Sequence, residues 1–267
     1  MLGFTNSGTQ CFFNALIQSL ISCDLPRSNN PLLQEFHKII KEKKNDTIEI
    51  FTLLCKLQKR PTILRQEDAH EFLLFFIESA DLKERFYIRH ICRIHCHKCQ
   101  KLTNNISYET CPPELSFECF STENLNEHIK INYKYPEDYK CECGAQNKDN
   151  QIIVQTYKLA LISDILVVTF KKYLGKKIIP FPLTMEFPGK VGTFNYELVA
   201  QIEHFGNSGL IKSPAGNSYF SSGHYTARCL REINGKKEVF NFNDTSVSPS
   251  KFEPTAETYI LFYRKLK

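Results

Sequence analysis

Apolar residues recur at helical spacing through the first third of the chain. Between residues 11 and about 80 they fall three or four positions apart, which places their side chains on one face of a helix. The pattern predicts helices over about 11–20 and 32–40, then over 48–57 and 67–79. We therefore expect a helical subdomain at residues 1–85.

From about residue 86 the pattern changes to short β-rich runs. Turns rather than long helices join these runs, which favours an antiparallel sheet and an α+β fold. One short helix is expected inside this half, at about residues 122–130. The predicted strands cover residues 86–96, 102–111, 152–159, 165–173, 196–205, 224–231, 238–243 and 259–264.

Composition narrows the class of protein. A chain of 267 residues that is 42% hydrophobic can bury a substantial core. No apolar run approaches the roughly 20 residues that span a bilayer, and the first residues do not resemble a signal peptide. The net charge of +5 is spread over scattered lysines, unlike a nucleic-acid-binding face. We expect an intracellular protein, cytoplasmic or nuclear, that binds neither membrane nor nucleic acid.

The cysteines indicate a metal site. There are 11, an odd number that fits thiols or metal ligands in a reducing compartment better than a disulfide framework. Cys96 and Cys99 form a C-x2-C pair, and Cys141 and Cys143 form a C-x-C pair. Four thiolates can close a tetrahedral site, so we predict a structural zinc ion on these residues. The possible substitutes are Cys92, His95, His97 and Cys111.

Cys11 is the candidate nucleophile. It follows a polar, glycine-containing loop at the start of a predicted helix, where unpaired backbone N–H groups favour a thiolate. His224 and then Asn243-Asp244 follow far downstream, in the order of a cysteine-protease triad. The alternative for Cys11 is a buried structural cysteine. His204 is a weaker rival to His224, and we expect it to be a strand residue beside the cleft.

Three sequence boxes resemble those of the ubiquitin-specific proteases, the papain-like deubiquitinases. Residues 3–18 resemble G-L-x-N-x-G-N-T-C-[FY]-x-N-x-x-L-Q, and residues 66–73, QEDAHEFL, resemble Q-Q-D-A-x-E-F-L. Residues 223–247 resemble G-H-Y-x-A followed by F-[ND]-D-x-x-V, and residues 259–263 resemble the terminal Y-x-L-F-Y strand.

The chain also departs from the family pattern. Thr9 and Gln10 replace the usual Asn and Thr before the nucleophile, and Val239 replaces a usual Trp. The second cysteine pair of the family is usually C-x2-C rather than the C-x-C of Cys141 and Cys143.

The resemblance implies a single catalytic domain shaped like a right hand, with the cleft between thumb and palm. The helical thumb would span residues 1–85, the zinc-tipped β fingers 86–160 and the antiparallel β palm 161–267. A Gly/Ser-rich stretch within residues 206–218 would form a loop over the ubiquitin tail.

The resemblance also implies roles for individual residues. Cys11 would attack and His224 would take its proton, while Asn6 and the Cys11 N–H hold the oxyanion. Asn243 would orient the histidine, a role that Asp244 could share or replace. Asn6 could also fix the loop as an Asx-turn residue. The residues expected to contact substrate are Gln66, Asp68, Gly223 and Tyr225.

The function implied is hydrolysis of the isopeptide or peptide bond after the C-terminal glycine of ubiquitin. The partners would be ubiquitin and ubiquitinated proteins, bound by a monomer that needs no cofactor for catalysis. Gln10 and Val239 keep an alternative open, a catalytically inactive ubiquitin-binding scaffold. A protease for a ubiquitin-like modifier is another alternative, whereas three catalytic boxes argue against a small zinc-ribbon binding module.

Overall fold

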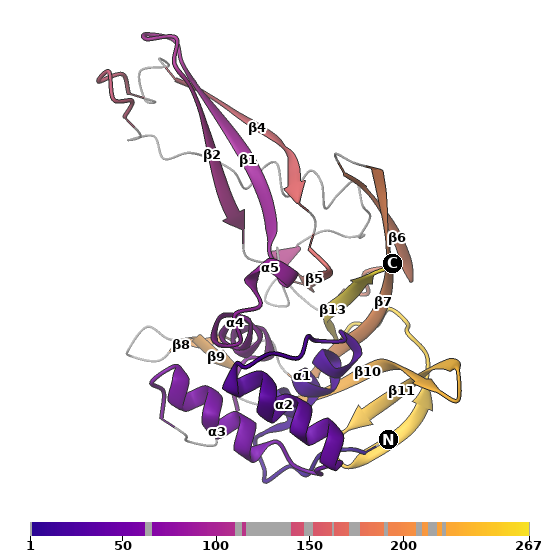
Figure 1. The fold of residues 1–267 in the computed structure, drawn as a ribbon. Coiled ribbons are helices and arrows are strands. Elements are labelled where there is room, and N and C mark those ends of the chain that lie inside the picture. Colours follow the sequence, from indigo (N-terminus) through magenta and orange to yellow (C-terminus); the bar gives the residue numbers. More distant parts are fainter. Residues whose placement is uncertain are drawn as a thin grey trace.

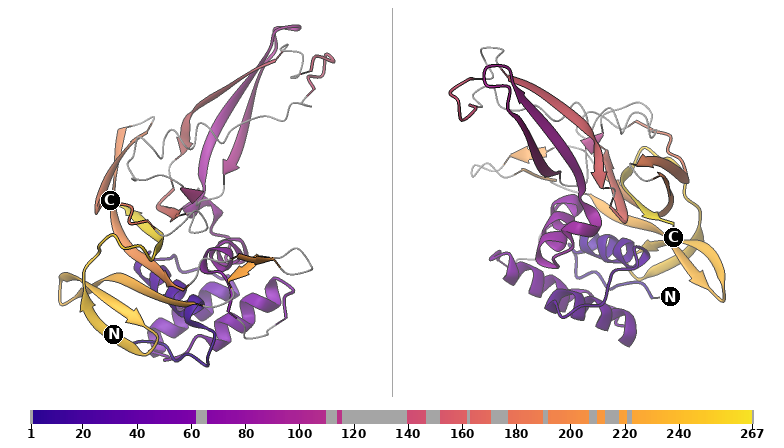
Figure 2. Two further views of the ribbon diagram at one scale, coloured as in Figure 1. Left: turned by 180° about the vertical axis from the view of Figure 1, so that it is seen from behind. Right: turned by 45° about the horizontal axis from the view of Figure 1, so that its top comes forward.

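Helices and strands divide the molecule into three parts (Figure 1). This computed structural model describes residues 2–61, 66–109, 114–115, 140–146, 152–161, 163–170, 177–189, 192–206, 210–212, 218–220 and 223–266. Helices gather at one end, a large sheet lies beside them, and a narrow three-stranded sheet projects away from both (Figures 1 and 2). The α+β fold and its right-hand shape are confirmed, and we call these parts the thumb, the palm and the fingers.

Local capping explains where two thumb helices begin. The Asn30 side chain accepts hydrogen bonds from the N–H groups of Leu32 and Leu33, at 2.9 and 3.4 Å, and Pro31 takes the first helical position. Asp68 caps another helix, which therefore starts two residues later than the pattern predicts. The helices are α1 (Cys11–Ser22), α2 (Pro31–Glu42), α3 (Ile48–Leu57), α4 (Ala69–Ser79) and α5 (Lys83–Phe86).

Helix α1 forms the centre of the molecule. Eleven of its twelve residues are buried, because it packs against palm strands on one side and against α4 on the other. Its aromatic residues interlock with those of α3 and α4: Phe12 meets Phe72 edge-on at 5.0 Å between ring centroids, and Phe51 stacks on Phe72 at 5.6 Å. This packing fixes the helix that begins at Cys11 relative to the palm.

The palm is an eight-stranded sheet with the order β12-β11-β10-β7-β13-β5-β3, and β6 pairs with β7 outside this path. Its pairs are antiparallel except that β3 runs parallel to β5, so the palm sheet includes two residues from the segment assigned to the fingers. The strands are β3 (Glu114–Leu115), β5 (Ile165–Phe170), β6 (Thr184–Gly189), β7 (Gly192–Phe205), β10 (His224–Ile233), β11 (Lys236–Asn243), β12 (Ser246–Ser250) and β13 (Thr258–Lys265).

The fingers are an antiparallel sheet with the order β2-β1-β4. The strands are β1 (Ile88–Cys96), β2 (Leu102–Glu109) and β4 (Ile152–Leu161). Strands β1 and β2 form a hairpin in which His95 pairs with Leu102. The hairpin turn follows Cys96 and lies at the tip that points away from the thumb (Figure 1).

Some elements depart from the sequence prediction. Strand β12 was not predicted, because its sequence, SVSPS, lacks a clear alternation of apolar residues. It includes Pro249, which a strand tolerates at the edge of a sheet, where β12 lies. Two short strands, β8 (Leu210–Lys212) and β9 (Ser218–Phe220), pair within the stretch expected to be a loop. The helix predicted at 122–130 lies outside the described residues. No helix in the described part of the chain has the length and apolar character needed to cross a bilayer.

Candidate active site

Cys11 is the first residue of helix α1. Its side chain is only 4% exposed. Gln10 occupies the N-cap position, but its side chain makes no capping hydrogen bond. The N-cap side chain therefore accepts from none of the first N–H groups of α1, and a helix N-terminus of this kind favours nearby negative charge. The position suits a thiolate and an oxyanion.

His224 lies between Cys11 and Asn243. Its Nε2–H donates to Oδ1 of Asn243 at 2.6 Å, so Nδ1 is the nitrogen left for the thiol. A hydrogen bond with Cys11 is the largest cause that raises the pKa of His224 to about 9. Burial opposes this rise, and the contact with Asn243 adds to it. The structure thus brings the predicted nucleophile, base and orienting residue together, and the residue that faces the imidazole is Asn243.

Asp244 has a different set of partners. Its carboxylate accepts hydrogen bonds from the side-chain amides of Asn6 and Asn14, each at 2.9 Å. Its backbone carbonyl accepts from the N–H of Phe4, also at 2.9 Å. Asp244 therefore ties the loop before Cys11 to the palm, next to the residue that orients His224.

Asn6 anchors the same loop. Its Oδ1 accepts hydrogen bonds from the N–H groups of Gly8 and Gln10 at 2.9 and 3.0 Å, which is an Asx-turn arrangement. Its Nδ2 donates one hydrogen to Asp244, and an amide nitrogen carries two. One donor of Asn6 remains for a substrate oxygen, so the loop-fixing role and the oxyanion role are compatible.

Gln10 is buried beside the nucleophile. Its Oε1 accepts a hydrogen bond from the Ser7 hydroxyl at 3.0 Å, and its side chain is 4% exposed. Its Nε2 is buried without a hydrogen-bond partner in the part of the chain that the structure describes. The substitution at this position therefore adds an unsatisfied donor next to Cys11.

Two predicted cleft residues join the thumb to the palm. The Gln66 side chain donates from Nε2 to the carbonyl oxygen of Gly223 at 2.5 Å, directly before His224. Gly223 has no room for a side chain, because a Cβ there would lie 2.3 Å from Nε2 of His204 and 2.8 Å from the carbonyl oxygen of Phe205. His204 is a buried strand residue, as expected.

The other two predicted cleft residues are engaged inside the protein. Asp68 accepts hydrogen bonds from the N–H groups of His70 and Glu71 and from the Tyr259 hydroxyl, the last at 2.7 Å. Burial raises the pKa of Asp68, and these hydrogen bonds partly offset the rise. Tyr225 is 1% exposed and lies in the core rather than on the cleft surface.

A polar cavity of about 390 Å³ opens beside His224 and Asn243 on the palm. Its floor holds an ion pair between Arg228 and Glu203, with Nε 3.0 Å from Oε2. The remaining lining residues are Phe205, Thr226, Asn241, Ser248 and Ser250. The imidazole of His224 thus contacts Cys11 and also borders this cavity.

Sequence reasoning did not select two residues that support the site, Asn14 and Tyr259. Asn14 links Asp244 to the carbonyl oxygen of Thr5 and to the hydroxyl of Thr47. Tyr259 holds Asp68. Both residues fall inside the matched boxes, so the pattern marks them, but their partners lie far away in sequence and only the fold reveals them.

The four predicted metal ligands converge at the tip of the fingers. The Sγ atoms of Cys96, Cys99, Cys141 and Cys143 all lie within 4.8 Å of one another. Cys96 and Cys143 are separated by 3.6 Å, and Cys99 and Cys141 by 3.7 Å. Tetrahedral zinc with Zn–S bonds near 2.3 Å requires sulfur separations of about 3.8 Å, so these residues fit the ion. The C-x-C spacing does not prevent convergence.

Tight turns present these cysteines. The N–H of Cys96 donates to the Lys101 carbonyl, and the N–H of Cys141 donates to the Ala145 carbonyl, at 3.0 and 2.8 Å. Lys101 also pairs with Glu142 across the two turns. Of the possible substitutes, His95 and His97 lie outside the cluster of potential ligands, the Cys92 side chain is not described, and Cys111 lies outside the described residues.

Comparisons with known proteins agree with this geometry. A family model described as "Ubiquitin carboxyl-terminal hydrolase" matches residues 2–263. Ubiquitin carboxyl-terminal hydrolase 4 of Pongo abelii is 25% identical over 79% of this chain and 20% of its own length. Ubiquitin carboxyl-terminal hydrolase Usp2 of Drosophila melanogaster is 22% identical over 99% of this chain and 35% of its own length. The chain therefore spans about a fifth to a third of these relatives.

Solved structures share the fold. The Ubp8/Sgf11/Sus1/Sgf73 module of SAGA bound to ubiquitin aldehyde contains a chain that superposes with a TM-score of 0.66 at 20% identity. The match covers 100% of this chain and 70% of that one. A second structure, of the Ubp8-Sgf11-Sgf73-Sus1 SAGA DUB module, gives a TM-score of 0.61 at 22% identity. With the family model matching almost from end to end, the chain belongs to the ubiquitin carboxyl-terminal hydrolase family.

Proposed function

We propose that this chain is a thiol-dependent deubiquitinase that hydrolyses the isopeptide or peptide bond after the C-terminal glycine of ubiquitin. One observation carries the proposal: His224 hydrogen-bonds to Cys11 and to Asn243 at once, which is the arrangement a cysteine protease needs. The names of the relatives supply the substrate class.

The reaction follows from these contacts. His224 accepts the proton of Cys11, and the thiolate attacks the carbonyl carbon of the terminal glycine. As the C–N bond breaks, the imidazolium returns its proton to the leaving amine, and a thioester remains on Cys11. Water, deprotonated by His224, then attacks the thioester and releases the ubiquitin carboxylate and the free thiol.

The loop before Cys11 would stabilise the oxyanion. The remaining N–H of the Asn6 side chain and the Cys11 backbone N–H are the donors we assign to this role. Losing one such donor typically lowers the rate by about 10²–10³. Asp244 acts as a positioning residue, because it holds the Asn6 amide in place.

The fingers and the cleft would hold the substrate. We assign Gln66, Asp68 and Gly223 to contacts with the ubiquitin tail, and Tyr225 to support of the cleft from the core. The fingers would contact the globular body of ubiquitin. A zinc ion on Cys96, Cys99, Cys141 and Cys143 would crosslink the two turns at the finger tip and take no part in the chemistry.

A specific observation favours a second candidate function, an inactive ubiquitin-binding scaffold. The Gln10 amide nitrogen is buried and unsatisfied next to Cys11, where an unpaired polar group is costly and could alter the oxyanion site. The three boxes and the contacts of His224 favour the active enzyme over this candidate.

The test uses ubiquitin with a fluorogenic amine at its C-terminus. Purified protein should release the fluorophore, while Cys11→Ala should abolish release and still bind ubiquitin. Binding without turnover by the unaltered protein would establish the scaffold instead. Parallel substrates made from ubiquitin-like modifiers would reveal a different modifier specificity if one of them is turned over faster than ubiquitin.

A further inference from the structure

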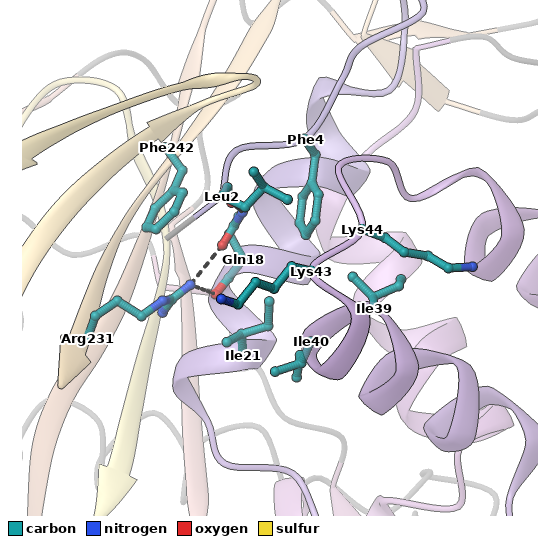
Figure 3. A pocket seen from close by; sticks show the side chains of 10 residues that line it. All are labelled: Leu2, Phe4, Gln18, Ile21, Ile39, Ile40, Lys43, Lys44, Arg231 and Phe242. Atoms are coloured by element: carbon teal, nitrogen blue, oxygen red, sulfur yellow. Dashed lines mark hydrogen bonds between the residues drawn. The ribbon is translucent and has the colours of Figure 1, made fainter. Parts of the chain in front are cut away.

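A second cavity lies two helical turns along α1 from Cys11. It has a volume of about 360 Å³ and opens between α1, α2 and the palm (Figure 3). Two of its apolar residues, Leu2 and Ile40, are 41% and 42% exposed, so the pocket presents apolar side chains to solvent. The apolar lining consists of Leu2, Phe4, Ile21, Ile39, Ile40 and Phe242.

The polar lining of this pocket carries positive charge and no carboxylate. Three cations line it, and one of them, Lys44, is neutralised by Glu35 and Glu49. In Figure 3 the Lys44 ammonium points away from the pocket, whereas Lys43 points toward the side occupied by Arg231. Lys43 and Arg231 are therefore the two cations that face the pocket.

Neither of the two inward cations has a carboxylate partner among the described residues. Arg231 donates from Nη2 to the carbonyl oxygen and to Oε1 of Gln18, at 2.9 and 2.8 Å, and from Nη1 to the Ser22 hydroxyl and the Leu230 carbonyl oxygen. All four acceptors are neutral, so these hydrogen bonds leave the charge of Arg231 uncompensated. Its guanidinium lies 4.8 Å from the ring centroid of Phe242 and is therefore held at the wall of the pocket. Lys43 forms no ion pair in the described part of the chain. The pocket thus combines an apolar interior with uncompensated positive charge.

We propose that this pocket binds a small hydrocarbon carboxylate, with its chain among the apolar residues and its carboxylate between Lys43 and Arg231. The volume lies near the lower end of the range for small-molecule sites, which are mostly apolar with a few polar groups that fix orientation. An anion balances the charge of Lys43 and Arg231, whereas a neutral or cationic ligand of the same shape leaves it unbalanced.

Two residues that line the pocket lie close in sequence to residues of the candidate active site. Phe4 lies two residues before Asn6 and donates its N–H to the carbonyl of Asp244. Phe242 precedes Asn243, the residue that orients His224. A ligand that packs on both rings should reduce local opening of these two segments, which hydrogen exchange can measure.

The test uses decanoate as the probe and decyltrimethylammonium as a ligand of matched chain length and opposite charge. Calorimetry with the purified protein should show saturable binding of one decanoate per chain, with the cationic ligand at least about tenfold weaker. Hydrogen exchange should slow at residues 2–4 and 240–242 when decanoate binds. Neither readout depends on catalysis, so their failure is distinct from failure of the proposed function.

Two variants have matched controls. Lys43 has a left-handed backbone with φ of 52°, which asparagine tolerates, so Lys43→Asn should weaken decanoate roughly threefold by removing one partly exposed charge. Lys59→Asn changes an exposed lysine of nearly the same φ, 53°, away from the pocket, and should have no effect. Ile40→Glu should weaken decanoate about tenfold or more, while Ile178→Glu, at a 63% exposed position, should not.

Three results would overturn the proposal. The first is no saturable decanoate binding, and the second is equal affinity for the two ligands of opposite charge. The third is binding that Ile40→Glu and Lys43→Asn leave unchanged. A fluorescent peptide with phenylalanine flanked by aspartates provides a further arm. Binding of this peptide without binding of decanoate would replace the proposal with a docking site for acidic peptides.

Discussion

The carboxylate of Asp244 holds the side chain of Asn6, with 2.9 Å between Oδ2 and Nδ2, although the two residues are 238 positions apart. The same carboxylate holds Asn14 in the helix that begins at Cys11. The residue next to it, Asn243, faces His224. Two adjacent residues at the end of β11 therefore serve opposite sides of the site, one the imidazole and the other the loop before the nucleophile.

This division of roles predicts different effects of two substitutions. Asp244→Asn keeps the side-chain size and tolerates the left-handed backbone of this residue, whose φ is 51°, but it replaces an acceptor of two hydrogen bonds. We expect a loss of about 1.5–3 kcal/mol in the free energy of unfolding, because hydrogen bonds to a charged group are lost. We also expect kcat to fall, with only a slight shift of the basic limb of the pH profile to lower pH, because the charge of Asp244 is the smallest of the causes that raise the pKa of His224. Denaturant titration and steady-state kinetics measure these effects, and unchanged stability would contradict the network.

Asn243→Ala should act through the histidine instead. The contact with Asn243 helps to raise the pKa of His224 to about 9, so its removal should move the basic limb of the kcat/KM profile to lower pH. The measurement is a pH profile with fluorogenic ubiquitin, in which Asn243→Ala should shift the basic limb further than Asp244→Asn does, because the hydrogen bond with Asn243 is a larger cause of the raised pKa than the charge of Asp244. A basic limb that stays in place in Asn243→Ala would contradict the assignment of Asn243.

Protonation of His224 should also link stability to pH. Its pKa in the folded protein, about 9, lies above its ordinary value of 6.5. The resulting stabilisation should be fully present below about pH 6.5 and should be lost as pH rises through about 9. The difference in unfolding free energy between the unaltered protein and His224→Gln should therefore shrink over this window. A difference that grows toward pH 9 would show that the imidazole is not stabilised in its charged form.

Gly223 should tolerate no side chain. In Gly223→Ala, the new Cβ would meet Nε2 of His204 and the carbonyl oxygen of Phe205, at 2.3 and 2.8 Å. Overpacking of this kind typically costs about 1–3 kcal/mol, and here it would also displace His224. Thermal unfolding and turnover should both be impaired. Adding His204→Ala should recover part of the loss, because it removes one of the two clashes, and no recovery at all would count against this explanation.

The cysteine cluster predicts one zinc ion per chain. Elemental analysis of purified protein should find it, and Cys143→Ser should lose it together with the ordered finger tip. Glu142→Gln is the matched control, because its side chain is 84% exposed and is not one of the four cysteine ligands. Zinc retained by Cys143→Ser at full stoichiometry would exclude ligation by this cysteine.

Periodicity predicted the helices well because their apolar faces are continuous. Helix α4 shows the limit of this reasoning, because Asp68 caps it and the helix begins at Ala69, two residues after the predicted start. Strand β12 escaped prediction because an exposed edge strand needs no apolar alternation. Local pattern thus identifies elements that pack on the core and fails for elements held only by their backbone partners.

The candidate site was likewise predicted only in part from the sequence. The boxes marked Cys11, His224 and the adjacent pair Asn243-Asp244 as candidates, because their order along the chain is distinctive. They did not determine which of these two neighbours faces the imidazole, because both are adjacent polar residues that can accept its hydrogen bond. Only the structure shows that Asn243 faces His224 and that Asp244 faces Asn6. They also indicated a substrate contact for Tyr225, whereas Tyr225 is 1% exposed and pairs across the sheet with the buried His204.

The most direct test of the account is mass spectrometry of the protein after reaction with ubiquitin that carries a C-terminal propargylamide. We expect one covalent ubiquitin per chain, with the bond mapped to Cys11, and none after Cys11→Ala or after unfolding. An unmodified protein that still binds ubiquitin, or a bond mapped to another cysteine, would contradict the claim that Cys11 is the nucleophile.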